Sequence, residues 1–211
     1  MANFDGVARW YRWLEYSAFW STLEQCRFTL LPELVDAHRV LILGEGDGRF
    51  LQKFLTGNEH AQIDVVDASP AMLKLAHSRV SEEQLDRVRF HQTDVRYWSF
   101  PKAEYDTIVT CFFLDCFTQD TLVDLLPRIA KSAKPGAQWL LAEFADASTL
   151  RTRIWLSALY AFFRVTTNLE ASRLAPLSEL LSEEKWERKH RQKFSGGLMT
   201  AELWQKAFSP T

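Results

Sequence analysis

The chain has 211 residues, of which 47% are hydrophobic and 25% charged, and its formal net charge at pH 7 is -2. This size and composition are typical of one globular α/β domain with a substantial core. The nearly balanced charge, without a basic arm, makes nucleic acid a poor candidate partner. Three cysteines without a CxxC or His/Cys cluster indicate neither a disulfide framework nor a metal site, and they favour a reducing compartment.

No targeting or membrane-spanning segment is expected. The opening residues lack the basic and apolar regions of a secretory signal. The longest largely apolar run, Ile154 to Phe163, is shorter than the about 20 residues that a membrane-spanning helix needs. These observations predict a cytoplasmic protein. Arg151 and Arg153 beside the apolar run leave contact with a membrane surface as an alternative.

Two helices are expected before the first strand. Residues 7–20 carry apolar and aromatic side chains on two stripes, which predicts a helix packed on both sides. Ser21 and Glu24 have the spacing of a capping box and predict the start of a second helix that runs toward Pro32 or Val35. We interpret residues 1–36 as a helical lid.

From residue 39 onward, short apolar runs alternate with helical patterns, as in βαβ units of a parallel sheet. Ser69 before Pro70 predicts a helix N-cap, and the Pro-Gly pair at 135–136 predicts a helix end. The last two segments are interpreted as an antiparallel hairpin on the edge of the sheet, joined at 195–197. The predicted strands are 39–43, 63–66, 88–91, 105–113, 138–144, 186–194 and 198–204, and the predicted helices are 49–55, 70–80, 119–134, 150–165 and 176–184.

Three alternating glycines, Gly44, Gly46 and Gly48, follow the first predicted strand in the segment VLILGEGDGRF. Glycine suits backbone that approaches a ligand closely or takes a positive φ. The free N–H groups at the start of the next helix can bind a polar ligand. The loop therefore predicts a nucleotide-binding site, with a tight strand-to-helix turn as the alternative. Its GxGxG spacing differs from the GxGxxG of dinucleotide-binding loops.

Two acidic residues follow the next two strands. Asp67 lies at about the distance past the glycines where a carboxylate can accept from both hydroxyls of a ribose. Asp94 follows the third strand, where it can accept from an adenine amino group while Val95 and Met72 enclose the ring. A helix cap at Asp67 and a turn at Asp94 are the alternative interpretations.

Residues 40–141 resemble the class I S-adenosylmethionine (SAM)-dependent methyltransferases. The glycine loop, Asp67, Asp94, the fourth strand and the Lys-Pro-Gly turn at 134–136 occur in the order of that family. The opening pattern Phe-Asp-x-x-Ala-x-x-Tyr at 4–11 is similar to that of members acting on small molecules, quinone methyltransferases among them. The resemblance implies a seven-stranded sheet with an antiparallel last strand, and SAM bound across the carboxyl ends of the strands. The product would be S-adenosylhomocysteine.

The resemblance also implies which residues contact the cofactor. The family often has an acid at the position of Ile42, and Glu45 is a candidate to replace it near the methionine amino group; a solvated loop residue is the alternative. Cys111 and Phe112 would lie beside the methionine part of SAM. The full set of expected cofactor residues is Gly44, Glu45, Gly46, Asp47, Gly48, Asp67, Ala68, Met72, Asp94, Val95, Cys111 and Phe112.

The expected reaction is an in-line displacement at a methyl group that the sulfonium already activates, so the protein mainly aligns the reactants. A base is needed only where the acceptor is protonated at neutral pH. Asp115, Tyr11 and His91 are the candidate catalytic residues, Glu143 is a further available acid, and no pair among them has diagnostic spacing. Asp115 could instead cap a helix. Tyr11 is expected to contact the methionine end of the cofactor or the acceptor.

The sequence thus predicts one α/β domain, a three-layer sandwich whose mostly parallel, seven-stranded sheet has an antiparallel edge hairpin. Its parts are the lid (1–36), a SAM-binding core (37–145) and a helical segment with the hairpin (146–211). If the aromatic residues of the lid and of 150–165 line a pocket rather than the core, the acceptor is a small apolar or aromatic molecule. The alternatives are a SAM-binding regulatory or structural protein and an NAD(P)-dependent oxidoreductase. No metal is expected, and the sequence indicates neither the methylated atom nor the oligomeric state.

Overall fold

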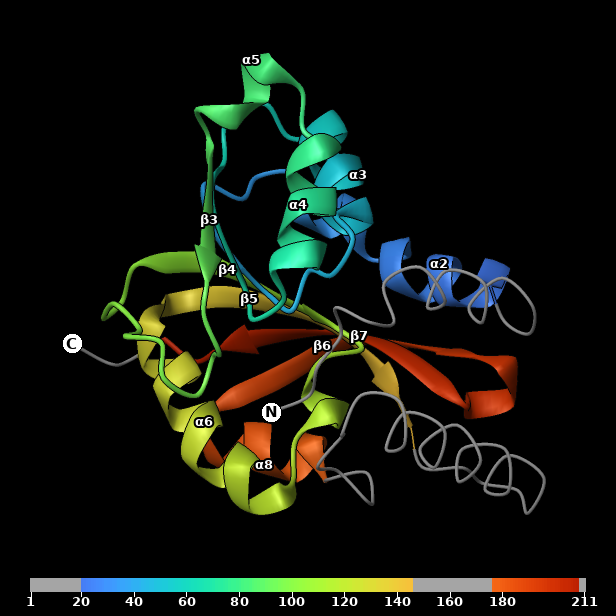
Figure 1. Ribbon diagram of the computed structural model, residues 1–211. Helices are drawn as coiled ribbons and strands as arrows, with labels where there is room; N and C mark the ends of the chain where they lie inside the picture. Colours follow the sequence, from blue (N-terminus) through green and yellow to red (C-terminus); the bar gives the residue numbers. More distant parts are fainter. Residues whose placement is uncertain (1–19, 146–175, 209–211) are drawn as a thin grey trace.

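The structure is a computed structural model that describes residues 20–145 and 176–208 (Figure 1). The predicted helix at 150–165, Tyr11, and all of the predicted helix at 7–20 except Trp20 lie outside these segments. The division into a lid, a core and a C-terminal segment therefore stays a prediction.

Seven strands form one sheet in the order β3-β2-β1-β4-β5-β7-β6 (Figure 1). The first five strands pair with one another in parallel. They are β1 (Arg39–Leu43), β2 (Gln62–Asp67), β3 (Val88–Gln92), β4 (Tyr105–Cys111) and β5 (Ala133–Phe144). The remaining two, β6 (Trp186–Phe194) and β7 (Met199–Lys206), form an antiparallel hairpin, and β7 also pairs antiparallel with β5. The predicted sheet and its antiparallel edge hairpin are confirmed.

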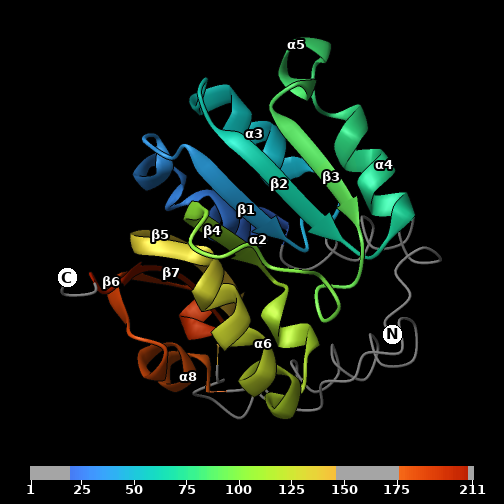
Figure 2. The same ribbon diagram turned by 90° about the vertical axis from the view of Figure 1, so that its left-hand side faces the viewer.

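Helices cover both faces of this sheet and complete the three layers (Figure 2). One face packs against α2 (Trp20–Phe28), α3 (Arg49–Gly57) and α4 (Pro70–Ser78). The other face packs against α6 (Gln119–Ser132) and α8 (Leu177–Glu183). Side chains alternate between the faces along each strand: in β1, Val40 and Ile42 face the first layer, whereas Leu41 and Leu43 face the second. Each fully buried aliphatic side chain of this kind contributes about 1.5–3 kcal/mol to stability.

Four short helical segments connect these elements, namely η1 (Leu31–Leu34), α5 (Glu82–Leu85), η2 (Leu114–Cys116) and η3 (Ser195–Gly197). The sequence patterns predicted none of the four as a separate element. Each is only one turn or less, and a single turn is too short to establish a periodic hydrophobic pattern. Of the four, η2 matters most for function because it follows β4 at the carboxyl edge of the sheet.

Helix starts follow their side-chain caps where the sequence offers one. The Ser69 Oγ accepts a hydrogen bond from the Met72 backbone N–H at 3.2 Å, so the predicted cap of α4 is confirmed. The predicted capping box at Ser21 is wrong, because α2 already includes Trp20 and Ser21 lies within the helix. The spacing of a serine and a glutamate alone does not fix a helix start, since tertiary packing sets where the helix begins.

Two predicted boundaries around the central strands are also corrected. β4 ends at Cys111, two residues before the predicted end, because Phe112 has a φ of +54° and leaves the extended conformation. α6 ends at Ser132, and the Pro-Gly pair at 135–136 lies within β5 instead of terminating the helix. The chain enters the sheet at once, since Ala133 already pairs with Tyr105 of β4.

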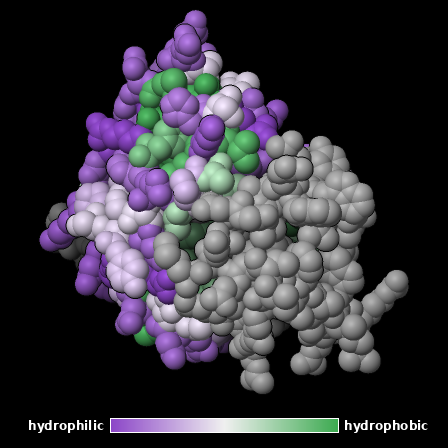
Figure 3. Space-filling model, in the orientation of Figure 1, coloured by the Kyte–Doolittle hydropathy of each residue, from purple (hydrophilic) through white to green (hydrophobic). Residues whose placement is uncertain are grey.

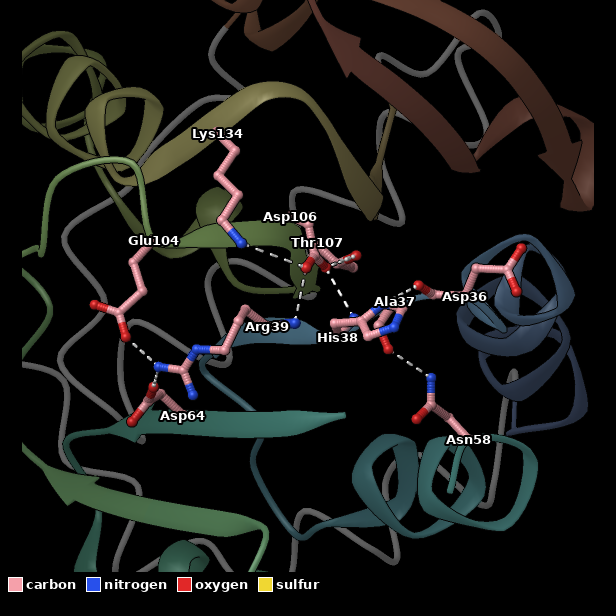
Figure 4. Close-up of polar contacts among 10 residues, drawn as sticks. All are labelled: Asp36, Ala37, His38, Arg39, Asn58, Asp64, Glu104, Asp106, Thr107 and Lys134. Carbon is pink, nitrogen blue, oxygen red and sulfur yellow. Dashed lines mark hydrogen bonds and ion pairs between the residues drawn. The ribbon is translucent and has the colours of Figure 1, made fainter. Parts of the chain in front are cut away.

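Polar contacts hold the amino ends of β1 and β4 together, at the edge opposite the glycine loop (Figure 4). The Asp106 carboxylate accepts from the backbone N–H groups of His38 at 3.1 Å and Arg39 at 2.9 Å. The Arg39 guanidinium in turn forms ion pairs with Asp64 and Glu104. These contacts align the strands and thereby position their carboxyl ends.

The surface of the described part is mixed in character. On the face shown in Figure 3, hydrophilic side chains predominate and hydrophobic ones gather in the upper part. The large hydrophobic residues that are most exposed, Val35, Tyr97, Val123 and Phe208, lie in separate parts of the chain. Within residues 20–145 and 176–208, no helix combines the length and the apolar character needed to cross a bilayer.

Candidate cofactor and acceptor site

The glycine loop joins the carboxyl end of β1 to α3, and all three of its glycines have a positive φ: +67° at Gly44, +68° at Gly46 and +88° at Gly48. A Cβ at Gly48 would come within 2.4 Å of the Ala76 backbone in α4, so this glycine permits close packing of two helices. A Cβ at Gly46 would meet nothing within 4 Å. The middle of the loop therefore borders open space, as a backbone that receives a ligand must.

Asp67, the last residue of β2, faces this loop. Its Oδ2 accepts from the Gly46 backbone N–H at 3.1 Å, and its Oδ1 accepts from the Ser69 N–H at 2.9 Å. The carboxylate thus stands beside the loop glycine at which a Cβ would meet nothing within 4 Å.

Glu45 is not a solvated loop residue. Its Oε1 accepts from the Leu51 backbone N–H at 2.9 Å, in the first turn of α3, where Gly48 at the N-cap has no side chain to do so. Burial, partly offset by that hydrogen bond, raises the pKa of Glu45 to about 8. Glu45 is therefore largely protonated at neutral pH, and a cation placed beside it would favour its ionised form.

Asp47, the other acid of the loop, forms ion pairs with arginines. Its Oδ2 forms ion pairs with the Arg49 Nε at 2.9 Å and the Arg79 Nη2 at 3.2 Å. Its backbone oxygen also accepts from the Arg79 Nε at 2.7 Å. Asp47 therefore joins α3 to the end of α4, and this structural role accounts for its charge.

The residues expected around an adenine ring lie after β2 and β3. Met72 and Val95 are buried, whereas Ala68 is half-buried. The Asp94 carboxylate forms ion pairs with Arg96, with an Oδ2–Nη2 distance of 2.7 Å. Burial raises the pKa of Asp94, but the hydrogen bonds and charge of Arg96 outweigh this effect and lower the pKa. Asp94 is thus a fixed anionic acceptor.

The segment after β4 turns sharply beside the glycine loop. Phe112 has a φ of +54°, and its N–H donates to the Ala142 backbone oxygen of β5 at 2.6 Å. The next ring, Phe113, packs on Gly44, where a Cβ would come within 1.9 Å of the Phe113 Cδ2. Cys111 packs against the core, and burial raises the pKa of its thiol.

Glu143, near the end of β5, anchors this segment. Its Oε1 accepts from the N–H groups of Phe113 at 3.1 Å and Leu114 at 2.9 Å. The other carboxyl oxygen, Oε2, is buried and has no hydrogen-bond partner. Burial, and then the charge of Asp115, raise the pKa of Glu143 well above its usual value. The residue is 2% exposed, so a neutral, protonated carboxyl is the form that this position favours.

Asp115, in η2, lies beside Glu143. Burial raises its pKa to about 6, while hydrogen bonds with Cys116 and Glu143 act in the opposite direction. The Cys116 thiol donates to the Asp115 Oδ1 at 3.7 Å. Asp115 and Glu143 therefore titrate as a coupled pair whose pKa values burial raises, so that a proton lost by one carboxyl can be held by the other.

Arg27 of α2 is a cation that contacts the segment after β4. Its guanidinium carbon lies 5.9 Å from the centroid of the Phe112 ring. Its charge lowers the pKa values of Glu45 and Cys111, although burial dominates both. A guanidinium here could bind a ligand carboxylate. The sequence patterns did not identify Arg27, because only the fold brings α2 to the ends of β1 and β4.

His91 is placed elsewhere. Its Nε2 lies 2.7 Å from the Asp64 Oδ1, and the other Asp64 oxygen accepts from the Tyr105 hydroxyl at 3.2 Å. The His91 ring also packs 5.5 Å from that of Trp98. Within the described segments, the hydrogen bonds of His91 go to this network across the sheet and not to Asp115. Tyr11 lies outside those segments, and in them no cluster of three or more acidic, histidine or cysteine side chains could hold a metal ion.

Comparison with known proteins agrees with this geometry. Residues 40–136 match the family model described as a methyltransferase domain. A malonyl-[acyl-carrier protein] O-methyltransferase of Paenibacillus sp. (strain JDR-2) is 35% identical over 78 residues, which are 35% of this chain and 28% of that enzyme. An uncharacterized methyltransferase, YdaC, of Bacillus subtilis (strain 168) is 27% identical over 128 residues, 59% of this chain and 68% of that protein. The chain thus spans less than a third of the length of the Paenibacillus relative.

Solved structures share the fold. The 1,6-didemethyltoxoflavin-N1-methyltransferase of Burkholderia thailandensis, with its substrate and S-adenosylhomocysteine bound, superimposes with a TM-score of 0.68 at 18% identity. The alignment covers 97% of this chain and 85% of that one. Residues 40–136 therefore match a methyltransferase domain, and the sheet order is that of the methyltransferase fold these structures share.

Proposed function

We propose that the protein is a SAM-dependent methyltransferase that transfers a methyl group to a small, apolar or aromatic organic acceptor. The observation that carries the proposal is the meeting of three features at the carboxyl edge of the sheet. These are the open glycine loop at Gly46, the Asp67 carboxylate beside it, and the turn after β4 that carries Asp115. Ligands of open α/β sheets bind at this edge.

The residues at this edge fit the groups of SAM. Asp67 would accept from the ribose hydroxyls, and Asp94 from the adenine amino group between Met72 and Val95. Glu45 and Arg27 offer an acid and a cation for the methionine amino and carboxylate groups. When bound, SAM supplies a methyl group activated by its sulfonium. The protein then excludes water and aligns the acceptor with that methyl group.

Among the candidate catalytic residues, Asp115 is the one best supported. It is ionised at neutral pH and lies at the carboxyl edge of the sheet, whereas the hydrogen bonds of His91 support a structural role. Tyr11 remains a candidate contact for the acceptor. The segments that carry Asp115 and Glu143 also carry two pairs of aromatic rings about 5 Å apart, Phe112 with Phe144 and Phe113 with Phe117, which supports an apolar acceptor.

Calorimetry tests the cofactor. SAM and S-adenosylhomocysteine should bind with micromolar dissociation constants, and NADH should not. Binding of NADH but of neither sulfur ligand would exclude the proposal. Conversion of SAM to S-adenosylhomocysteine in the presence of a metabolite extract then separates an enzyme from a non-catalytic SAM-binding protein, since only the enzyme produces it.

A further inference from the structure

Within residues 20–145 and 176–208, neither of the two carboxyls on the proposed acceptor side, Asp115 and Glu143, forms an ion pair. Glu143 Oε2 is buried without a hydrogen-bond partner, and Asp115 holds a negative charge beside it. Burial of one unpaired charge and one unpaired polar atom is costly. Native structures retain such groups mainly where a ligand or a proton completes them.

The charged groups around this pair come from every element that meets there. Arg27 and Cys26 belong to α2, and Glu45 belongs to the glycine loop. Burial, and then the charge of Glu143, raise the pKa of Cys26 to about 12, while the charge of Arg27 acts in the opposite direction. Burial first, then the charges of Asp115 and Glu143, and lastly that of Asp67, raise the pKa of Cys116. Acids of β2, the glycine loop, η2 and β5 therefore act on the cysteines at this edge of the sheet, and Arg27 is the cation that the described contacts provide there.

SAM would account for only part of this imbalance. Its carboxylate suits Arg27 and its amino group suits Glu45, as proposed above, so neither of these groups of SAM is left to bind Asp115 or the Glu143 Oε2. Two pairs of aromatic rings belong to the segments that carry these residues, with Phe112 and Phe144 5.2 Å apart and Phe113 and Phe117 5.1 Å apart. A site with a buried negative charge among aromatic rings suits an apolar molecule that carries one cationic group.

We propose that the Asp115–Glu143 pair binds the amino group of the acceptor, and that the acceptor is an apolar or aromatic primary amine. The inference rests on the proposed methyltransferase function. The ionised Asp115 carboxylate accepts from the amino group, and Glu143 holds both the β4–η2 turn and the shared proton. Anionic acceptors are rejected, because they would place a second negative charge beside the pair.

The chemistry of the transfer is balanced by this pair. An acceptor bound as its ammonium form first loses a proton to Asp115, which exposes the nitrogen lone pair. The nitrogen then forms a bond to the methyl carbon as the carbon–sulfur bond breaks, and the electron pair of that bond stays on sulfur. The methylated amine leaves as a cation, and the proton on Asp115 passes to solvent.

Titration calorimetry with the full-length protein tests this proposal. S-Adenosylhomocysteine is titrated first, because its failure to bind would count against the proposed function itself. Benzylamine, n-hexylamine, benzyl alcohol and benzoate are then titrated at pH 7.5 into the saturated protein, or into the free protein if S-adenosylhomocysteine does not bind. At least one amine should bind at least about tenfold more tightly than benzyl alcohol, and benzoate should not bind.

Isosteric variants show which groups are responsible. Asp115→Asn and Glu143→Gln should each weaken binding of the favoured amine at least about tenfold. Asp120→Asn, which removes an exposed acid five residues further on, should leave it unchanged. Thermal melting of each variant separates loss of fold from loss of binding. Equal affinity for amine and alcohol, binding of neither amine, or undiminished amine binding in a folded Asp115→Asn variant would overturn the proposal.

The pH dependence of amine binding to the unmodified protein is an independent test of the proposal. Lowering the pH from 7.5 to 5 protonates Asp115, whose pKa is about 6, while both amines keep their charge. Amine affinity should therefore fall about tenfold or more, whereas benzyl alcohol affinity should change little. Amine binding that is constant over this range would show that the Asp115 carboxylate does not hold the amino group.

Discussion

The ring of Phe113 packs on the backbone of Gly44, so closely that a Cβ at Gly44 would lie 1.9 Å from the Phe113 Cδ2. The two residues come from different strand ends, 69 positions apart in the chain, since Gly44 follows β1 and Phe113 follows β4. Their contact ties the glycine loop to the turn that carries Asp115. Cofactor and acceptor sides of the proposed site are therefore mechanically linked.

Substitution of Gly44 by alanine should destabilise the protein more than substitution of Gly46. Both glycines have nearly the same positive φ, +67° and +68°, so alanine brings a similar backbone strain of about 1–2 kcal/mol at each. Only at Gly44 does the new methyl group also displace the Phe113 ring. Urea unfolding of Gly44→Ala and Gly46→Ala measures the difference. Equal losses in the two variants would mean that the ring moves aside without cost.

Asp67→Asn should weaken the binding of S-adenosylhomocysteine at least about tenfold. The carboxylate loses charge-assisted bonds to the ribose hydroxyls, each worth about 1.5–3 kcal/mol. Asp67 also accepts from Gly46 and Ser69, so Asp67→Ala should lower stability as well, whereas asparagine retains one acceptor oxygen. Calorimetry gives the affinities and thermal melting gives the stabilities.

Ser69→Ala is the matched control for that experiment. It removes the cap of α4 at a cost of about 0.5–2 kcal/mol but leaves the Asp67 carboxylate in place. Its affinity for S-adenosylhomocysteine should equal that of the unmodified protein. If Asp67→Asn retained full affinity as well, Asp67 would have only a structural role.

Stability should fall as the pH rises from about 5 to 8, in part because of Glu45. Its pKa is raised from 4.5 in the unfolded chain to about 8 in the folded protein. Between these values the folded state binds more protons than the unfolded state, so the free energy of unfolding decreases with pH. Asp115, raised from 3.8 to about 6, acts in the same direction over the lower part of the window.

Glu45→Gln isolates this effect, because glutamine keeps an oxygen that can accept from the Leu51 N–H but does not ionise. The melting temperature of this variant should decline less between pH 5 and 8 than that of the unmodified protein. Glu59→Gln, at an exposed position, should leave the slope unaltered. A Glu45→Gln curve parallel to that of the unmodified protein would contradict the raised pKa.

Asp106→Ala should destabilise the fold without affecting the site. The substitution leaves the backbone N–H groups of His38 and Arg39 without their acceptor at the amino end of β1. Each lost hydrogen bond to a charged group costs about 1.5–3 kcal/mol. Chemical unfolding should reveal the loss, while S-adenosylhomocysteine affinity, measured at a temperature where the variant is folded, should stay the same. A large drop in affinity would show that the two edges of the sheet are coupled.

The sequence by itself determined the sheet and the position of the cofactor loop. The apolar run at 39–43, the three glycines and the Ser69 cap act over a few residues, and the Ser-Gly-Gly turn at 195–197 between two strand-like segments predicted the edge hairpin. Such local patterns are visible in one dimension because the residues that cause them are neighbours in the chain. The same locality explains why Asp67 could be placed at the end of β2, next to the glycine loop.

Only the tertiary structure decided how the acceptor side is built. Glu143 meets Phe113 and Leu114 across about 30 positions, and Arg27 reaches Phe112 from α2. His91 of β3 forms a hydrogen bond with Asp64 of β2, and the spacing of these two residues in the sequence did not predict this contact. The protonation of a carboxyl depends on its burial and on charges that folding brings close to it. Neither of these can be derived from the residue type alone. The sequence therefore named the acids, whereas the fold decided which of them share a proton.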